Sequence, residues 1–183
     1  MRIAELNIII GTNGTGKTTL LRSILQDSKQ KVLIVTPDDI EWTDYEAVEL
    51  NKPEDFVFKG IRRHIFDPSK KGTLKKLEYF KKGILVFDDC RSYFPAQTPP
   101  ELHQLLIRKR QREADIFAVG HGFTEVPPVF FTFANGIFLF RTTDNIIRRK
   151  DCLKDFDKTA DAQLRVNQKA KSNPHYVEYI PFV

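Results

Sequence analysis

The sequence has 183 residues, of which 41% are hydrophobic and 29% are charged, a balance typical of a folded soluble chain rather than a disordered one. The formal net charge of +5 is mildly basic and by itself only weakly indicates a polyanionic partner. Two cysteines, Cys90 and Cys152, fit neither zinc-ligand spacing nor a disulfide framework. This excludes a small zinc-bound domain and a small disulfide-stabilised domain. No membrane span is predicted, because prolines interrupt the most apolar later stretch, residues 126–140.

Apolar runs alternate with helical patterns along the chain, as expected for a mostly parallel sheet covered by helices. Buried strands are predicted at 6–10, 32–36, 84–88, 116–120 and 137–141, where the residues are apolar almost without interruption. Helices are predicted at 17–27, 73–80, 99–113 and 158–170, and a last strand at 176–180. These elements predict one α/β domain over residues 1–183, in which about 148–183 form a basic C-terminal extension packed on the core.

The first predicted strand leads directly into a phosphate-binding motif, G-x-x-x-x-G-K-[ST], which residues 11–18 match at every position. Its glycines allow backbone N–H groups to turn toward phosphate oxygens, and the start of the next helix adds partial positive charge. Lys17 is predicted to span the β- and γ-phosphates, and the Thr18 hydroxyl to ligate Mg²⁺. The alternative, a chance glycine-rich turn, is disfavoured by the strand before the motif and the helix after it. The predicted nucleotide-binding residues are Gly11, Thr12, Asn13, Gly14, Thr15, Gly16, Lys17, Thr18 and Thr19.

Charge is distributed unevenly between the second and third predicted strands. Residues 38–55 are rich in acidic side chains, whereas residues 59–82 are rich in lysine and arginine. Such asymmetry indicates a basic surface that meets a polyanion, and a solvated face of ordinary lysines is the alternative. The DNA-contact candidates are Arg62, Arg63, Lys70, Lys71, Lys75 and Lys76.

The strand predicted at 84–88 ends in two acidic residues, Asp88 and Asp89. A P-loop enzyme needs a carboxylate on a neighbouring strand to hold its metal ion, so Asp88 is predicted to contact Mg²⁺ through water. Asp89 follows at the position of a catalytic residue that orients the attacking water. Alternatively, Asp89 only caps the turn that follows the strand.

Later elements add three polar candidates for catalysis. His121 follows the strand predicted at 116–120, where a polar group senses the γ-phosphate or the attacking water; a purely structural strand-end histidine is the alternative. The helix predicted at 99–113 ends in a run of basic residues that could supply an arginine finger to a neighbouring subunit. DNA-phosphate contact or solubility would also explain this run. Arg141, at the end of the strand predicted at 137–141, is a further finger candidate.

This order of motifs resembles the FtsK–HerA superfamily of DNA-pumping ATPases. It is similar in particular to the compact branch with Zot-like phage assembly proteins and the genome-packaging ATPases of tailless, membrane-containing icosahedral viruses. The likeness covers about residues 3–145 and is carried mainly by residues 87–141. The run Lys109-Arg110-Gln111-Arg112 falls where these relatives have an H-R-H-like element, which implies Arg110 as the first choice of arginine finger. Two positions depart from the family pattern, since Asp89 replaces the usual Glu and His121 the usual Gln.

The resemblance implies a RecA-like or FtsK–HerA-like three-layer sandwich that uses ATP and Mg²⁺. It further implies a hexameric ring, a DNA-stimulated ATPase activity, double-stranded DNA in a central channel and capsid vertex proteins as possible partners. The expected function is a motor that pumps DNA into a capsid, located in the host cytoplasm or associated with the virion. A Zot-like export ATPase and a P-loop small-molecule kinase are the alternatives. Because no transmembrane anchor is predicted, the packaging branch is favoured over the Zot-like one.

Overall fold

The structure, a computed structural model, describes residues 3–67, 72–94 and 99–182. Within these residues the chain forms a seven-stranded sheet with the strand order β3-β2-β4-β5-β1-β6-β7. All neighbouring strands are parallel except β7, which pairs antiparallel with β6. The strands are β1 (Leu6–Ile10), β2 (Lys31–Thr36), β3 (Ile61–Ile65), β4 (Gly83–Phe87), β5 (Ala114–Gly120), β6 (Gly136–Leu139) and β7 (Glu178–Pro181).

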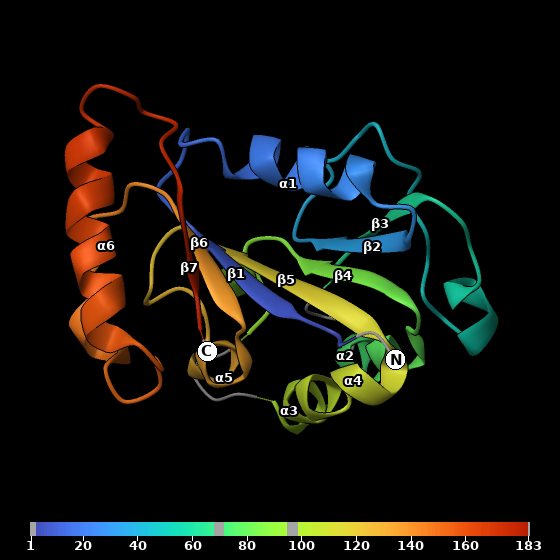
Figure 1. Cartoon of the computed structure of the whole chain (residues 1–183). Helices are drawn as coiled ribbons and strands as arrows, with labels where there is room; N and C mark the ends of the chain where they lie inside the picture. Colours follow the sequence, from blue (N-terminus) through green and yellow to red (C-terminus); the bar gives the residue numbers. More distant parts are fainter. Residues whose placement is uncertain (1–2, 68–71, 95–98, 183) are drawn as a thin grey trace.

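Helices cover both faces of the sheet, with α1 on one face and α2 to α5 on the other (Figure 1). Helix α6 stands beside β6 and β7. Among the described residues no helix has the length and apolarity needed to span a bilayer. The helices are α1 (Lys17–Asp27), α2 (Thr73–Lys76), α3 (Pro100–Ile107), α4 (Lys109–Arg112), α5 (Pro128–Phe133) and α6 (Phe156–Lys169), with short 3-10 turns at Pro53–Phe56, Leu77–Tyr79, Cys90–Ser92 and Ile146–Arg149.

Two hydrophobic clusters fill the space between these layers. Side chains alternate along each strand, so Ile8 and Ile10 of β1 point into one cluster and Ile9 into the other. Leu21 and Leu25 of α1 complete the cluster around Ile9. Because both faces of the sheet are covered, every position of a core strand needs an apolar residue. This uninterrupted apolar pattern is why the core strands are recognisable in the sequence. The predicted fold, a P-loop type α/β sandwich with a mostly parallel sheet, is confirmed.

One strand and one α-helix were not predicted from the sequence. Strand β3 reads Ile-Arg-Arg-His-Ile and forms the edge of the sheet, where charged residues replace the apolar pattern of a buried strand. Helix α5 spans only Pro128–Phe133 and begins at a proline pair, which resembles a loop signal. Both elements depend on packing against the rest of the sheet more than on local sequence.

The single helix predicted at 99–113 is wrong. The chain leaves the helical conformation at Arg108 (φ −85°, ψ 1°), which separates α3 from α4. This break turns Lys109 inward, where its side chain is only 8% exposed and its ammonium donates to the carbonyl of Ala4 at 2.9 Å and to Oδ1 of Asn135 at 3.1 Å. Hydrogen bonds to a distant part of the chain thus replace the continuation of the helix.

Strand direction decides which residues meet where the strands end. The six parallel strands all end at one edge, the carboxyl edge, where the P-loop follows β1. Strand β7 runs in the opposite direction, and its first residue, Glu178, pairs with Leu139, the last residue of β6. The turn that leads into β7 therefore lies at the same edge as the P-loop. Ligands bind at this edge in open α/β sheets.

Candidate nucleotide-binding site

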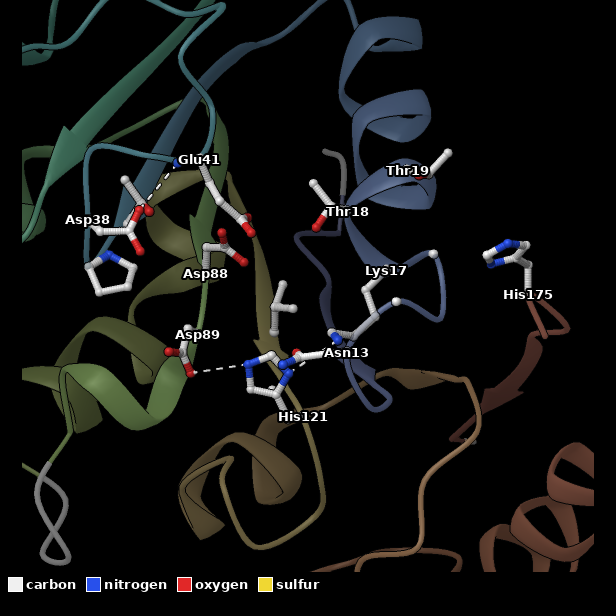
Figure 2. Close-up of a pocket in the computed structure, with 16 residues that line it drawn as sticks. Asn13, Lys17, Thr18, Thr19, Asp38, Glu41, Asp88, Asp89, His121 and His175 are labelled. Atoms are coloured by element: carbon white, nitrogen blue, oxygen red, sulfur yellow. Dashed lines mark hydrogen bonds and ion pairs between the residues drawn. The ribbon is translucent and has the colours of Figure 1, made fainter. Parts of the chain in front are cut away.

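A pocket of about 510 Å³ opens at the carboxyl edge of the sheet (Figure 2). The predicted residues Lys17, Thr18, Asp88, Asp89 and His121 all line it, although the first two begin α1 and the others follow strands β4 and β5. The structure therefore brings the phosphate, metal and water-orienting candidates together. Asn13, Gly14, Gly16 and Thr19 of the predicted nucleotide-binding set also line the pocket.

The P-loop is held in place by its neighbours in the sheet. The N–H of Thr12 donates to the carbonyl of Arg141 at 2.9 Å, and the Thr15 hydroxyl donates to the carbonyl of Thr12 at 2.8 Å. Gly16, immediately before α1, has φ 100°, a conformation that side chains rarely adopt and glycine adopts freely. The loop is thereby closed around the start of α1, whose free N–H groups attract anions.

The Lys17 ammonium lies inside this loop. It donates to the carbonyls of Gly11 at 2.7 Å and Thr12 at 3.1 Å. Burial lowers the pKa of Lys17, and the nearby carboxylate of Asp88 acts in the opposite direction. A charge placed this deep suits phosphate oxygens, because low local dielectric strengthens the attraction.

Asp88 is a buried carboxylate that the chain only partly satisfies. The Trp42 indole donates from Nε1 to Oδ2 of Asp88 at 2.6 Å. Burial nevertheless raises the pKa of Asp88 to about 6, and the carboxylates of Glu41 and Asp89 add to this rise. Trp42 itself adopts a left-handed backbone (φ 61°) while 1% exposed, a conformation costing about 1–3 kcal/mol that tends to persist near functional sites.

The oxygen groups of this pocket fit a magnesium ion. The described residues contain no cluster of three or more His, Cys, Asp or Glu side chains able to hold a metal by themselves. Mg²⁺, however, commonly uses one or two carboxylates together with the phosphates of its nucleotide. Burial disfavours the charged form of Asp88 and so raises its pKa. A divalent cation beside the carboxylate would offset this cost by stabilising the charged form. Asp88 and the Thr18 hydroxyl would therefore hold the ion.

Asp89 divides its two oxygens between the turn and the pocket. The Ser92 hydroxyl donates to Oδ2 at 2.7 Å, whereas Oδ1 is buried and has no hydrogen-bond partner within the described chain. Its backbone is left-handed (φ 54°), a conformation that Asp tolerates better than most residues. This gives a physical reason for Asp where the resemblance implies Glu. The turn-capping and water-orienting interpretations are thus compatible.

His121 lies between Lys17 and Asp89 on one wall of the pocket (Figure 2). The Lys17 ammonium has only donors, so it donates to Nδ1 of His121 at 3.3 Å. The ring proton is then on Nε2, which lies 4.0 Å from Oδ1 of Asp89. The N–H of His121 also donates to the Glu125 carboxylate at 3.1 Å, which fixes the end of β5.

The two arginine-finger candidates lie in different places. Arg110 is exposed on α4, which precedes β5 and so lies at the opposite edge of the sheet from the pocket. Arg141 follows β6 next to the P-loop, with its carbonyl bound to Thr12 and its side chain exposed. Neither side chain lines the pocket of its own chain, so Arg110 could reach a nucleotide only in a neighbouring subunit. The choice between them stays a prediction.

The DNA-contact candidates on β3 have partners inside the chain. Arg62 forms an ion pair with Glu46 at 3.1 Å. The guanidinium of Arg63 donates to the carbonyls of Glu41 and Tyr45, at 3.2 Å in each case, and so braces the loop that carries Trp42. DNA contact by these residues stays a prediction. Lys75 and Lys76 lie in α2, and Lys70 and Lys71 lie outside the described residues.

Several residues of the pocket were missed in the sequence. Asp38 and Glu41 line it and follow the end of β2, so the strand-end reasoning applied to Asp88 would also have found Asp38. Trp42 carries no local signal, because its role depends on a side chain 46 positions away. His175 lines the pocket only because β7 runs antiparallel.

Solved structures with a similar fold include viral packaging enzymes. The genome packaging NTPase B204 from Sulfolobus turreted icosahedral virus 2, in complex with ATP-gammaS, matches with a TM-score of 0.74 and 13% identity over 98% of both chains. B204, the DNA-packaging ATPase from Sulfolobus turreted icosahedral virus, matches with a TM-score of 0.67 and 14% identity over 100% of both. No protein-family model and no curated sequence matches the chain. Identity this low shows a shared fold, and the predicted resemblance to packaging ATPases is confirmed at that level.

Proposed function

We propose that this protein is a Mg²⁺-dependent ATPase that works in a ring of identical subunits and moves double-stranded DNA into a viral capsid. The observation that carries the proposal is the meeting of Lys17, Thr18, Asp88, Asp89 and His121 in one pocket. These are the groups needed to bind phosphates, hold a cation and orient water. The fold shared with B204, a DNA-packaging ATPase, supports the packaging role.

The P-loop and Lys17 account for binding of the triphosphate. Backbone N–H groups of the loop and the start of α1 face the phosphates, and the Lys17 ammonium exchanges its carbonyl partners for β- and γ-phosphate oxygens. A magnesium ion on Thr18 and Asp88 would neutralise charge on those phosphates during transfer. Because Lys17, Asp88 and Asp89 already line the pocket, the exchange of partners by Lys17 is the main rearrangement expected when the nucleotide binds.

Asp89 and His121 account for activation of water. The Asp89 carboxylate, which lines the pocket and whose Oδ1 has no hydrogen-bond donor among the described residues, would turn that oxygen toward the attacking water and accept a hydrogen bond from it. The His121 ring, held by Lys17 on one side, directs its Nε2–H toward the same place. Water held between the two is oriented toward the γ-phosphate that Lys17 binds. The pair thus links phosphate binding to water orientation.

DNA movement would follow from ring assembly and basic charge. Arg110, at the far edge of the sheet, would insert into the pocket of the next subunit and stabilise transition-state charge there. Lysine and arginine side chains on the surface would contact DNA phosphates without reading the sequence, which makes binding strongly salt-dependent. Exposed Lys75 is one such candidate.

The decisive experiment measures ATP turnover by the purified protein with and without double-stranded DNA, at several salt concentrations. DNA should raise turnover, and the effect should fade as salt increases. Lys17→Ala should abolish turnover. Lys29→Ala removes the same charge from an exposed position near the end of α1 and serves as the control.

Other outcomes would point to other functions. Turnover that ignores DNA but consumes ATP in proportion to an added nucleoside or sugar would indicate a small-molecule kinase. Turnover that responds to neither would favour an export or assembly ATPase of the Zot type. Either result would overturn DNA translocation while leaving nucleotide binding intact.

A further inference from the structure

The turn between α6 and β7 carries a histidine to the nucleotide pocket. The chain leaves α6 at Lys169 and enters β7 at Glu178, and His175 lies between them at the carboxyl edge of the sheet. The N–H of His175 donates to Oδ1 of Asn173 at 3.2 Å. Tyr176, the next residue, accepts a hydrogen bond from the Lys169 ammonium at 2.9 Å. The turn is therefore anchored on both sides of His175.

His175 approaches the pocket from the side opposite the carboxylates. Figure 2 shows Asp88, Asp89 and His121 on one side of the start of α1 and His175 on the other. A Cβ atom built on Gly16 would lie 3.3 Å from Nδ1 of His175, so the ring is close to the last glycine of the P-loop. The two ends of the pocket thus have different chemistry.

The direction of a bound nucleotide follows from this arrangement. The γ-phosphate belongs at the end where Lys17, Asp88 and Asp89 gather, because the lysine would contact the β- and γ-phosphates there and Asp88 would hold the cation that neutralises their charge. The α-phosphate and the nucleoside must then extend past Gly16 and Thr19, away from the carboxylates. His175 is the pocket-lining side chain that stands beyond Gly16 in this direction.

The imidazole ring of His175 is free to contact a nucleobase and has no structural role within the described chain. The residue is exposed, and within the described residues its ring has no hydrogen-bond or ion-pair partner. A planar aromatic side chain offers its face to a nucleobase, and every base has a π-face to stack on it. We propose that His175 stacks on the base of the bound nucleotide, so that the C-terminal segment recognises the nucleoside while the P-loop binds the phosphates.

This inference rests on the proposed function, since it assumes a nucleoside triphosphate in the pocket. The experiment compares two ligands by calorimetry in the presence of Mg²⁺: β,γ-methylene ATP and inorganic tripolyphosphate. His175→Ala should weaken binding of the ATP analogue roughly fivefold to hundredfold, as expected for loss of one base–aromatic stack. Its affinity for tripolyphosphate should stay that of the parent protein. His175→Phe keeps a flat aromatic ring and should restore most of the lost affinity.

Lys171→Ala is the matched control, because it removes an exposed side chain, and a positive charge, from the same connection without removing an aromatic ring. Equal binding of the ATP analogue by His175→Ala and the parent would overturn the inference and leave the proposed function intact. Equal loss for both ligands would also overturn it, because the histidine would then act on phosphates or on the loop. Failure of the parent protein to bind either ligand would overturn both the inference and the proposed function.

Discussion

The two edges of the central sheet, where the parallel strands begin and where they end, differ in whether their charged groups have partners within the chain. At the edge where the parallel strands begin, Arg108 and Arg112 share the carboxylate of Glu78, and the buried ammonium of Lys109 donates to two oxygens. At the carboxyl edge, burial raises the pKa of Asp88 and Asp89 keeps a buried oxygen without a hydrogen-bond donor in the described chain. At the first edge these charged groups have partners in the chain, although Nε of Arg112 is buried without one, whereas at the second edge a buried carboxylate oxygen has no donor.

This difference indicates where other molecules bind. Unsatisfied buried groups cost free energy, so the proposed cation and nucleotide would stabilise the carboxyl edge by supplying the missing partners. On the opposite edge Arg108 and Arg112 pair with Glu78 and Lys109 donates to two oxygens, whereas Arg110 is exposed and forms no ion pair within the described residues. An exposed arginine without an ion pair suits a negatively charged partner outside the chain. The proposed ring brings these two unsatisfied regions together across a subunit interface.

The largest expected effect tests that junction. Arg110→Ala should lower DNA-stimulated turnover by about 10³–10⁵-fold at protein concentrations that favour assembly, while binding of an ATP analogue is retained. Arg108→Ala removes the same charge two residues away and should keep most of the activity. Mixing Arg110→Ala with Lys17→Ala should recover part of the turnover, because the second variant still supplies the finger. Equal activity of Arg110→Ala and Arg108→Ala would contradict the proposal that Arg110 acts on the nucleotide of a neighbouring subunit.

A smaller effect is expected from the carboxylate at the pocket wall. Asp89→Asn keeps the left-handed backbone accessible and can still accept from Ser92, but it loses the charge that orients water. Steady-state kinetics should show kcat reduced by about 10²–10⁴-fold with KM little changed. Ser92→Ala tests the turn alone and should cost much less. Normal kcat in Asp89→Asn would leave Asp89 with only its turn-capping role.

The smallest effect concerns the stability cost of the incomplete edge. The pKa of Asp88 is raised from 3.8 to about 6, so the folded state binds this proton more tightly than the unfolded state. The associated stability is fully present below pH 3.8 and is lost as the pH rises through about 6. Asp88→Asn should therefore raise the free energy of unfolding at pH 8 by up to about 3 kcal/mol, since one pKa unit corresponds to about 1.4 kcal/mol.

Urea denaturation at pH 8 and near pH 4 measures this effect without nucleotide or Mg²⁺. The advantage of Asp88→Asn should shrink at the lower pH, where the parent carboxyl is protonated in the folded protein. Asp161→Asn makes the same change at an exposed position of α6 and should give no such advantage. An Asp88→Asn protein that is less stable than the parent at pH 8 would mean that the carboxylate gains more from the Trp42 hydrogen bond than burial of its charge costs, since the amide oxygen of Asn accepts the same bond more weakly.

The sequence alone was enough to predict a phosphate-binding loop and the class of fold. A P-loop is a contiguous segment whose glycines, lysine and threonine bind phosphates through local geometry, so residues 11–18 were recognisable without any knowledge of their neighbours. Asp88 was found because buried parallel strands are apolar throughout and the first polar residue after one lies at the ligand-binding edge. The order of these motifs was enough to predict the fold that the structure confirms.

Only the tertiary structure decided which distant residues complete the pocket. The indole of Trp42 reaches Asp88 across 46 positions, and no local pattern distinguishes it from an ordinary core tryptophan. The break at Arg108 depends on hydrogen bonds from Lys109 to Ala4 and Asn135, which outweigh the helical periodicity of residues 99–113. His175 lies beside the P-loop because β7 pairs antiparallel with β6. Strand pairing and side-chain packing act between residues far apart in the chain, so their outcome cannot be predicted from any single segment of the sequence.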